Sequence, residues 1–162
     1  MSDLKLNNIL SKGGKSIINR WFDLILDTYP EADVLKKEKD RFANPVGHTI
    51  LTGIEDIFDG ILADYDLDKF LPLLDNIIRI RAIQEFAPSV AISFIFLLKQ
   101  AIREEVKVRN NGIFEELLVL ESKIDSLAAI SFDIYMKCRE KIHELKANEA
   151  RMAFRLLEKA QG

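Results

Sequence analysis

Cysteine, proline and glycine are scarce in this chain. Its 162 residues include 1 cysteine, 4 prolines and 7 glycines. The lone cysteine, Cys138, excludes an intramolecular disulfide and a zinc site built from paired cysteines. We expect it to be a small core residue.

Few turn signals are present, and no stretch shows the alternation of apolar and polar residues that half-buried strands need. The sequence therefore predicts an all-α protein.

Long apolar runs and an excess of positive charge are also missing. The longest apolar run, residues 90–98, is interrupted by Ser93 and is far shorter than the roughly 20 residues that span a bilayer. The first residues, MSDLKLNNILSKGG, lack the apolar core of a signal peptide. The net charge of −3 and the isoelectric point near 5.5 give no general attraction to nucleic acid or anionic lipid. We expect a cytoplasmic protein with no membrane or nucleic-acid partner.

Motifs for enzymatic or metal chemistry are absent as well. The glycines form no phosphate-binding cluster, and the sequence contains no nucleophile elbow or dinucleotide fingerprint. His48 and His143 lie far apart and lack the paired spacing of helical zinc sites. Segment 67–84 has no histidine that could be an axial haem ligand. We therefore predict no enzyme, no catalytic residue, no cofactor and no metal; a haem or metal site at His48 is the alternative.

What the sequence does contain is helical periodicity. A short amphipathic segment at 4–10 is predicted to break at Gly13 and Gly14. Pro72 is tolerable only in the first turn of its helix, and segment 31–43 is predicted to be a loop or a short helix. Apolar residues recur at helical spacing in five further segments: 17–26, 46–62, 67–84, 88–108 and 114–157.

The stretch NPVGHTI at 44–50 marks a defined helix start. Asn44 is a favoured N-cap, and Pro45 is a favoured first residue because its missing N–H would be unsatisfied there anyway. Gly47 falls near the middle of the apolar stripe, where it is predicted to let another helix approach closely. His48 falls on the wetter side. We interpret Asn44, Pro45 and Gly47 as structural.

The last predicted helix is too long for a compact domain. Its 44 residues would span about 66 Å, whereas a globule of this chain length is roughly 40 Å across. We predict a domain over 1–143 and a helical extension over 144–162. An exposed single helix is marginal in water unless it pairs, so we expect a homodimer; a frayed polar tail is the alternative. The interface candidates are Leu145, Asn148, Met152 and Leu156.

Two other binding sites are conceivable. Arg79, Arg81 and Arg103 could contact an anion or an acidic partner, although structural ion pairs, such as Asp75 with Arg79 at i, i+4, are the alternative. A small ligand could occupy an apolar pocket between segments 46–62 and 90–98.

Four stretches together resemble the RsbR/RsbRD N-terminal domain family: WFDLILDTYP at 21–30, DRFANPVGHTI at 40–50, IIRIRAIQEFAPSVAISFIFLLKQAIREE at 77–105 and SFDIYMKCREKIHEL at 131–145. The resemblance implies a globin-like helical bundle without haem. It further implies the sensory or regulatory half of stressosome proteins in sigma-factor control, which dimerise and signal through their last helix. Full-length members of that family continue into a STAS domain. For this chain we expect a stand-alone member that acts by binding an unknown regulatory protein partner.

Overall fold

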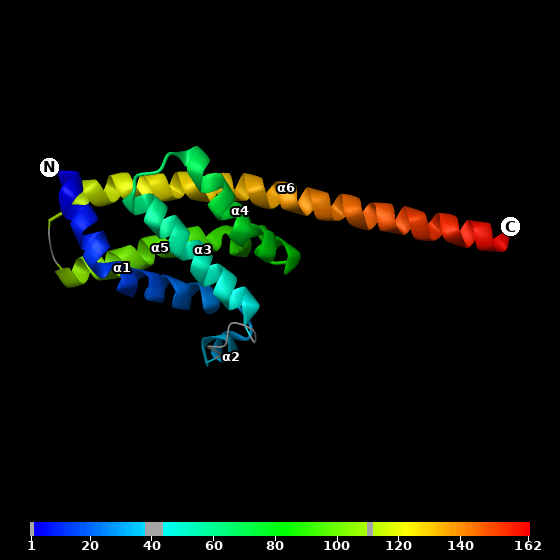
Figure 1. Cartoon of the computed structure of the whole chain (residues 1–162), viewed down its shortest axis with the longest axis horizontal. Helices are drawn as coiled ribbons and strands as arrows, with labels where there is room; N and C mark the ends of the chain where they lie inside the picture. Colours follow the sequence, from blue (N-terminus) through cyan, green and yellow to red (C-terminus); the bar gives the residue numbers. More distant parts are fainter. Residues whose placement is uncertain (1, 38–43, 110–111) are drawn as a thin grey trace.

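The computed structural model describes residues 2–37, 44–109 and 112–162, and in these ranges it contains six helices and no strand. The predicted all-helical fold with a long last helix is confirmed (Figure 1). Residues 38–43, the second half of the predicted loop or short helix at 31–43, lie outside the described ranges. The helices are α1 (Ser2–Leu26), α2 (Ala32–Lys37), α3 (Pro45–Leu62), α4 (Leu67–Ile83), α5 (Pro88–Arg109) and α6 (Phe114–Gln161).

Helix α1 runs without interruption through Gly13 and Gly14, so the predicted break is wrong. Both glycines are buried, and the ribbon changes direction part-way along α1 (Figure 1). A Cβ atom at Gly14 would lie 3.1 Å from Cε1 of Phe58 on α3. Glycine weakens a helix interior by about 1 kcal/mol relative to alanine, but here it allows α3 to pack closely against α1.

Helix α3 begins at a capped residue. Oδ1 of Asn44 accepts a hydrogen bond from the backbone N–H of Gly47 at 2.9 Å, and Pro45 is the first helical residue. The side chain of Asn44 occupies the space beside Gly47, and His48 is exposed. The cap therefore fixes the point at which α3 enters the bundle.

The close approach of a second helix occurs further along α3, at Gly53 and Gly60. A Cβ atom at Gly53 would lie 2.7 Å from Cγ1 of Ile77, and one at Gly60 would lie 2.9 Å from Cε1 of Phe70. Both of these neighbours belong to α4 and are fully buried. The two glycines thus set how closely α3 and α4 pack.

Helix α4 is capped by Asp66, whose Oδ1 accepts a hydrogen bond from the N–H of Lys69 at 3.2 Å. Pro72 lies in the second turn, one turn later than predicted, and is exposed. It removes a single intrahelical hydrogen bond there. The helix ends at Ile83, and Glu85 turns the chain toward α5 with a φ of 59°.

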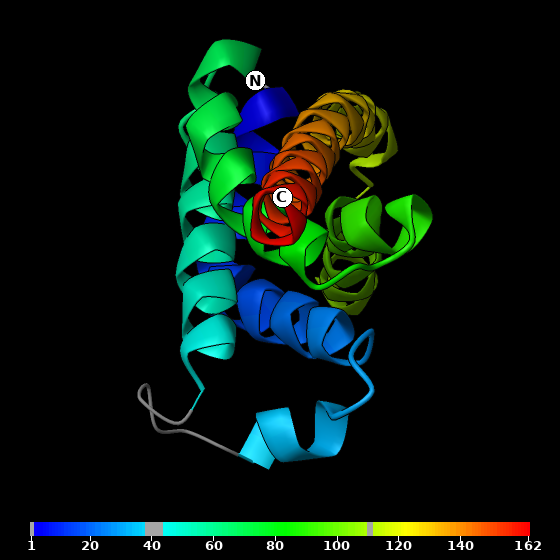
Figure 2. The same cartoon turned by 90° about the vertical axis from the view of Figure 1, so that its right-hand side faces the viewer.

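The core lies between α1, α3, α4, α5 and the first half of α6. The indole Nε1 of Trp21 in α1 donates a hydrogen bond to the backbone oxygen of Phe94 in α5 at 2.6 Å. Phe96 is 46% exposed, so the apolar 90–98 segment is open to solvent on one side. The end-on view shows α2 set apart from the bundle (Figure 2), and α2 has no buried residue.

Candidate functional site

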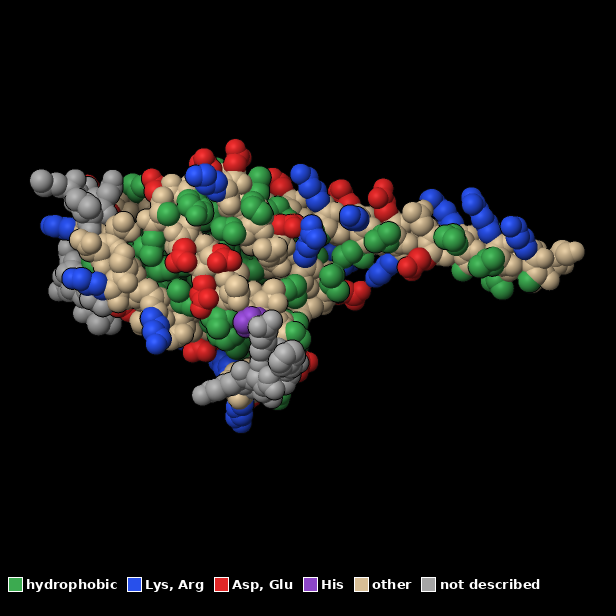
Figure 3. Space-filling view, in the orientation of Figure 1, with side chains coloured by type: hydrophobic (Ala, Val, Ile, Leu, Met, Phe, Trp, Pro, Cys, Tyr) green, Lys and Arg blue, Asp and Glu red, His purple; other side chains and the backbone are tan. Residues whose placement is uncertain are grey.

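Helix α6 begins in the core and ends in solvent. Its buried residues are Glu121, Ile124, Leu127, Ala128, Ser131 and Tyr135. Cys138 and Ile142 are half-buried, and every residue from His143 to Gly162 is exposed. At the standard rise this exposed part is roughly 30 Å long, and Figures 1 and 3 show that it projects from the body. One continuous helix therefore links the core to an exposed part, residues 143–162, which we call the outer segment.

The outer segment of α6 carries an apolar stripe. Leu145, Met152 and Leu156 are 56%, 63% and 66% exposed, and at about 100° per residue they fall within roughly 40° of one another on the helix surface. Asn148 lies at the edge of this stripe. These four residues form what we call the outer stripe, and the structure leaves it uncovered.

A second apolar pair was missed by the sequence analysis. Phe154 and Leu157 are each 62% exposed, and they lie away from the outer stripe, at about 180° and 120° from Leu145. Their spacing of three residues is the signal from which this pair could have been predicted. The outer segment therefore offers two apolar sides.

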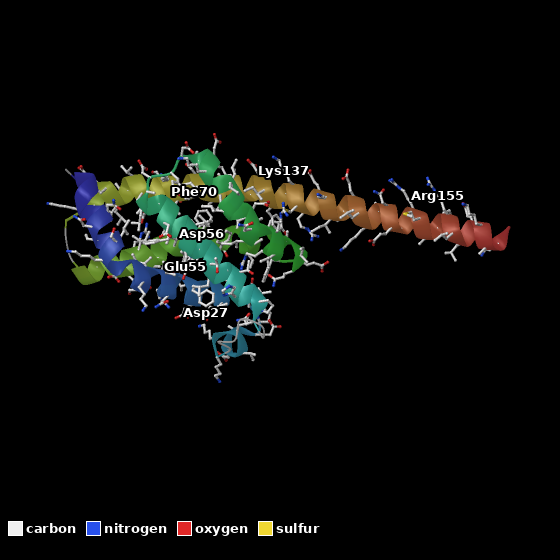
Figure 4. The ribbon with its side chains drawn as sticks, in the orientation of Figure 1. Asp27, Glu55, Asp56, Phe70, Lys137 and Arg155 are labelled. Carbon is white, nitrogen blue, oxygen red and sulfur yellow. The ribbon has the colours of Figure 1, made fainter. Side chains whose placement is uncertain are left out.

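A groove lies at the base of the outer segment, between α4 and α6, with a volume of about 370 Å³. Ile83 from α4, at the open end, is 70% exposed. Lys137 and Lys141 on α6 have no hydrogen bond or ion pair within the part of the chain that the structure describes, and Figure 4 labels Lys137 where α6 leaves the body. We call this feature the base groove. Its lining residues are Asp75, Arg79, Ile83, Ile134, Lys137, Cys138, Lys141, Ile142 and Leu145.

Cys138 lies on the wall of the base groove and is half-buried. Burial raises the pKa of its thiol above the ordinary value, and the carboxylate of Asp75 adds to this rise. Arg79 and Lys141 oppose the shift. The thiol is therefore protonated at neutral pH and behaves as part of an apolar surface.

The three arginines that the sequence analysis considered have different surroundings. Arg79 is exposed, lines the base groove and pairs with Asp75 at 2.8 Å. Arg81 is completely buried. Arg103 lies on α5, where its Nη2 donates a hydrogen bond to Oε2 of Glu121 on α6 at 2.8 Å. The structure therefore does not gather them into one cationic site, and Arg79 alone of the three faces the groove.

Arg81 ties the end of α4 to the beginning of α5. Its Nε and Nη2 donate hydrogen bonds to the backbone oxygens of Ala91 and Val90, each at 2.8 Å. The guanidinium also lies over the rings of Phe86 and Tyr29, at 4.7 and 5.4 Å from their centroids. Burial lowers its pKa below the ordinary value, with Tyr29 opposing the shift. The charge is thus satisfied by carbonyl oxygens and ring faces.

Helix α6 makes three polar contacts with the turn between α4 and α5 and with the end of α4. The hydroxyl of Tyr135 donates to the backbone oxygen of Phe86 at 2.7 Å, and Nη1 of Arg139 donates to that of Ala82 at 2.9 Å. Further out, Lys146 pairs with Glu85 at 3.3 Å. These contacts join α6 to the turn and to the end of α4, the helix that carries Arg81.

The described residues form neither a metal site nor a membrane-spanning helix. They contain no cluster of three or more His, Cys, Asp or Glu that could hold a metal ion, and His48 and His143 are exposed. None of the helices described has the length and apolarity needed to cross a bilayer. A second groove, of about 270 Å³, lies between α1, α3 and α6 and is lined by Leu6, Asn7, Leu10, Ile61, Leu62, Asp64, Glu116, Val119, Leu120 and Lys123.

Comparison with known families places this geometry in context. The model of the RsbT co-antagonist protein rsbRD N-terminal domain matches residues 15–150. The chain belongs to this family. The RsbRD N-terminal domain is a regulatory sensor domain of stressosome proteins, and the matched region includes the base groove and the first residues of the outer segment.

A relative of similar length extends the comparison. An uncharacterized protein of Archaeoglobus fulgidus is 25% identical over 146 residues, which cover 90% of this chain and 89% of the relative. No solved structure matches the chain. The globin-like arrangement that the resemblance implies therefore stays a prediction for this RsbRD N-terminal domain.

Proposed function

We propose that this RsbRD N-terminal domain is a non-enzymatic sensory module that regulates a protein partner and transmits its state through α6. The observation that carries the proposal is the continuity of α6 from a buried core helix to an exposed apolar stripe. A helix that is rigid over this length converts a small rotation in the core into a displacement at its outer end. Residues 1–143 are then the sensing body, and 144–162 are the outlet.

Self-association is the first part of this proposal. The outer stripe of Leu145, Asn148, Met152 and Leu156 forms the interface of a homodimer, because an isolated amphipathic helix gains most of its stability by packing its apolar side. Three of these side chains are more than half exposed in the single chain. Pairing would remove that apolar area from water, at about 25 cal/mol per Å².

The route of the signal is the second part. Tyr135 and Lys146 contact the α4–α5 turn, and Arg139 contacts Ala82 at the end of α4. A partner that rotates or separates the outer segments would strain these contacts, and conversely a change in the body would reorient the outlet. Coupling of this kind needs no bound cofactor.

The test is the mass of the full chain in solution, measured by light scattering after size-exclusion chromatography. We expect a dimer, and a monomer for a chain that ends at His143. Met152→Asp combined with Leu156→Asp should also give monomers, because it buries charge in the seam. The control is Ala147→Asp with Ala150→Asp, which makes the same change in charge at exposed residues on the opposite side of α6 and should leave the dimer intact.

Two outcomes would contradict this interface. A full chain that is monomeric at all accessible concentrations removes the homodimer. A dimer that survives the Met152 and Leu156 changes but dissociates with Phe154→Asp and Leu157→Asp moves the seam to the second apolar side.

A small-ligand binding module is the second candidate function. The pocket predicted between 46–62 and 90–98 is not among the grooves described above, since α3 packs on α1 and α4 while α5 packs on α1, α4 and α6. The groove between α1, α3 and α6 is the alternative place for a ligand. A ligand that binds the folded state raises its melting temperature, so a metabolite screen without any shift would exclude this function.

A further inference from the structure

We infer that the base groove is a docking site for an amphipathic helix of a partner protein whose apolar ridge is flanked by acidic residues. The inference deepens the proposed function and rests on it, because it assigns a kind of partner to the same region of α6. It concerns the stretch below the outer stripe, where α4 still lies beside α6.

The floor of the groove fits an apolar ridge. Its apolar lining comes from one residue of α4 and four of α6, namely Ile83, Ile134, Cys138, Ile142 and Leu145. Ile83 and Leu145, at the open end, are 70% and 56% exposed. A groove between two helices, with apolar residues at helical spacing on one wall, is the geometry that accepts a third helix.

The rim of the groove selects the charge of the occupant. Arg79, Lys137 and Lys141 line it, against the single carboxylate of Asp75, which already pairs with Arg79. Neither lysine has an ion-pair partner among the described residues. Lys137 and Arg155 lie 18 residues apart, or about five full turns, on the same side of α6 (Figure 4), with the exposed Glu144 between them. An occupant with acidic flanks would meet the three cations at the rim of the groove.

A second copy of this chain does not fit the groove. If two copies packed through this face with their α6 helices parallel and in register, Lys137 and Lys141 of each would face the same lysines of the other, and like charges at such a seam are unfavourable. The acidic surface of α3, with Glu55 and Asp56 labelled in Figure 4, has the opposite charge. However, the apolar residues of α3 are turned into the core, so that surface has no ridge to fill the floor.

Leu145 gives the docking site a regulatory consequence. It is the last residue of the base groove and the first of the outer stripe. A helix seated in the groove and a second copy paired along the outer segment would therefore meet at this residue. Occupation of the groove changes the stability of the dimer, because the docked helix and the second copy both contact Leu145.

The test uses two synthetic helical peptides on the full chain. Each is about 14 residues long and stapled, since short helices are marginal in water. They share one leucine ridge and differ only in their flanks, which are Glu in one and Lys in the other. Cys138, the only cysteine in the sequence, reports occupation through its rate of reaction with the disulfide reagent DTNB.

We expect the acidic peptide to bind at least about tenfold more tightly than the basic one at low salt and to slow the reaction of Cys138. The preference should weaken as salt is added. Lys137→Glu with Lys141→Glu should reverse the order of the two peptides. The control, Lys12→Glu with Lys15→Glu, makes the same change in charge on α1, at exposed residues, and should leave the order unchanged.

Three results would overturn the inference: equal binding of the two peptides, binding without protection of Cys138, and no binding of either peptide at millimolar concentration. Protection of Cys138 in the free dimer that disappears in the Met152→Asp, Leu156→Asp variant would also overturn it, because the second copy would then fill the groove. Light scattering on the same samples reports the dimer separately. A failed docking site with an intact dimer is thus distinguishable from a failed proposed function.

Discussion

At the scale of single residues, the molecule is stabilised by a few polar side chains that bond from one helix to the next. Arg81 bonds to carbonyl oxygens at the start of α5, and Arg103 pairs with Glu121 across α5 and α6. Both guanidinium groups use their planar fork to reach two acceptors, a geometry that lysine cannot reproduce. The identity of these arginines therefore matters more than their charge.

Arg81→Lys should destabilise the protein by about 2–3 kcal/mol, because at least one buried carbonyl contact is lost and a compact ammonium is left in an apolar site. Urea unfolding measures the change. Arg79→Lys on the same helix is the matched control, since Arg79 is 69% exposed and its replacement should cost less than about 0.5 kcal/mol. Equal effects at the two positions would show that the Arg81 contacts contribute little.

The Arg103–Glu121 pair predicts an acid-sensitive contribution to stability. The hydrogen bond from Arg103 lowers the pKa of Glu121 below its ordinary value of 4.5, against the opposing effect of burial. A carboxyl whose pKa is lower in the folded state stabilises that state above the unfolded pKa. The contribution is lost as pH falls below 4.5 and through the folded pKa.

Glu121→Gln should therefore reduce stability at pH 7 by about 1 kcal/mol, a modest value because Arg103 is 57% exposed. The difference from the unmodified chain should shrink as the pH is lowered through the acid range. Unfolding titrations at several pH values test this. Glu140→Gln, at an exposed position of α6, should show no comparable dependence; a constant difference for Glu121→Gln would refute the assignment.

At the scale of helices, the packing of α3 on α4 depends on positions without side chains. Gly53 faces Ile77 so closely that a Cβ atom would lie 2.7 Å from Cγ1. Ile77 is fully buried, so it cannot move aside without disturbing its neighbours. The separation of the two helices is thus set by this contact.

Gly53→Ala should destabilise the protein by about 1–2 kcal/mol, because the strain of overpacking exceeds the gain in helix propensity. Thr52→Ala is the control: it alters an exposed neighbour on the same helix and should be neutral or slightly stabilising. Thermal unfolding of the two variants decides the matter. A more stable Gly53→Ala variant would mean that α3 and α4 can separate without cost.

The helices themselves were predictable from sequence, since each leaves a local signal. Asn44 and Asp66 occupy N-cap positions, and the absence of proline and glycine from Phe114 to Leu157 indicated the long last helix. The error at Gly13 and Gly14 has a physical cause. A glycine pair has the same sequence pattern whether it ends a helix or lets two helices touch. Only the structure distinguishes the cases, because it places Glu105 of α5 beside Gly13 and Phe58 of α3 beside Gly14.

The candidate site was less predictable, because it depends on contacts between helices. The base groove exists because α4 ends at Ile83 while α6 continues past it. The burial of Arg81 depends on carbonyl oxygens of residues 90 and 91, which leave no trace in a pattern of side chains. The apolar stripe of Leu145, Met152 and Leu156 could be recognised, since its spacing is local.

At the scale of the whole molecule, the shape has a consequence for hydrodynamics. A body with a rod of roughly 30 Å attached experiences more friction in water than a sphere of the same 18.6 kDa. A single chain should therefore elute from a gel-filtration column ahead of a compact protein of equal mass, and should tumble anisotropically. Early elution is already a property of the monomer, and sedimentation velocity should give an elevated frictional ratio for it.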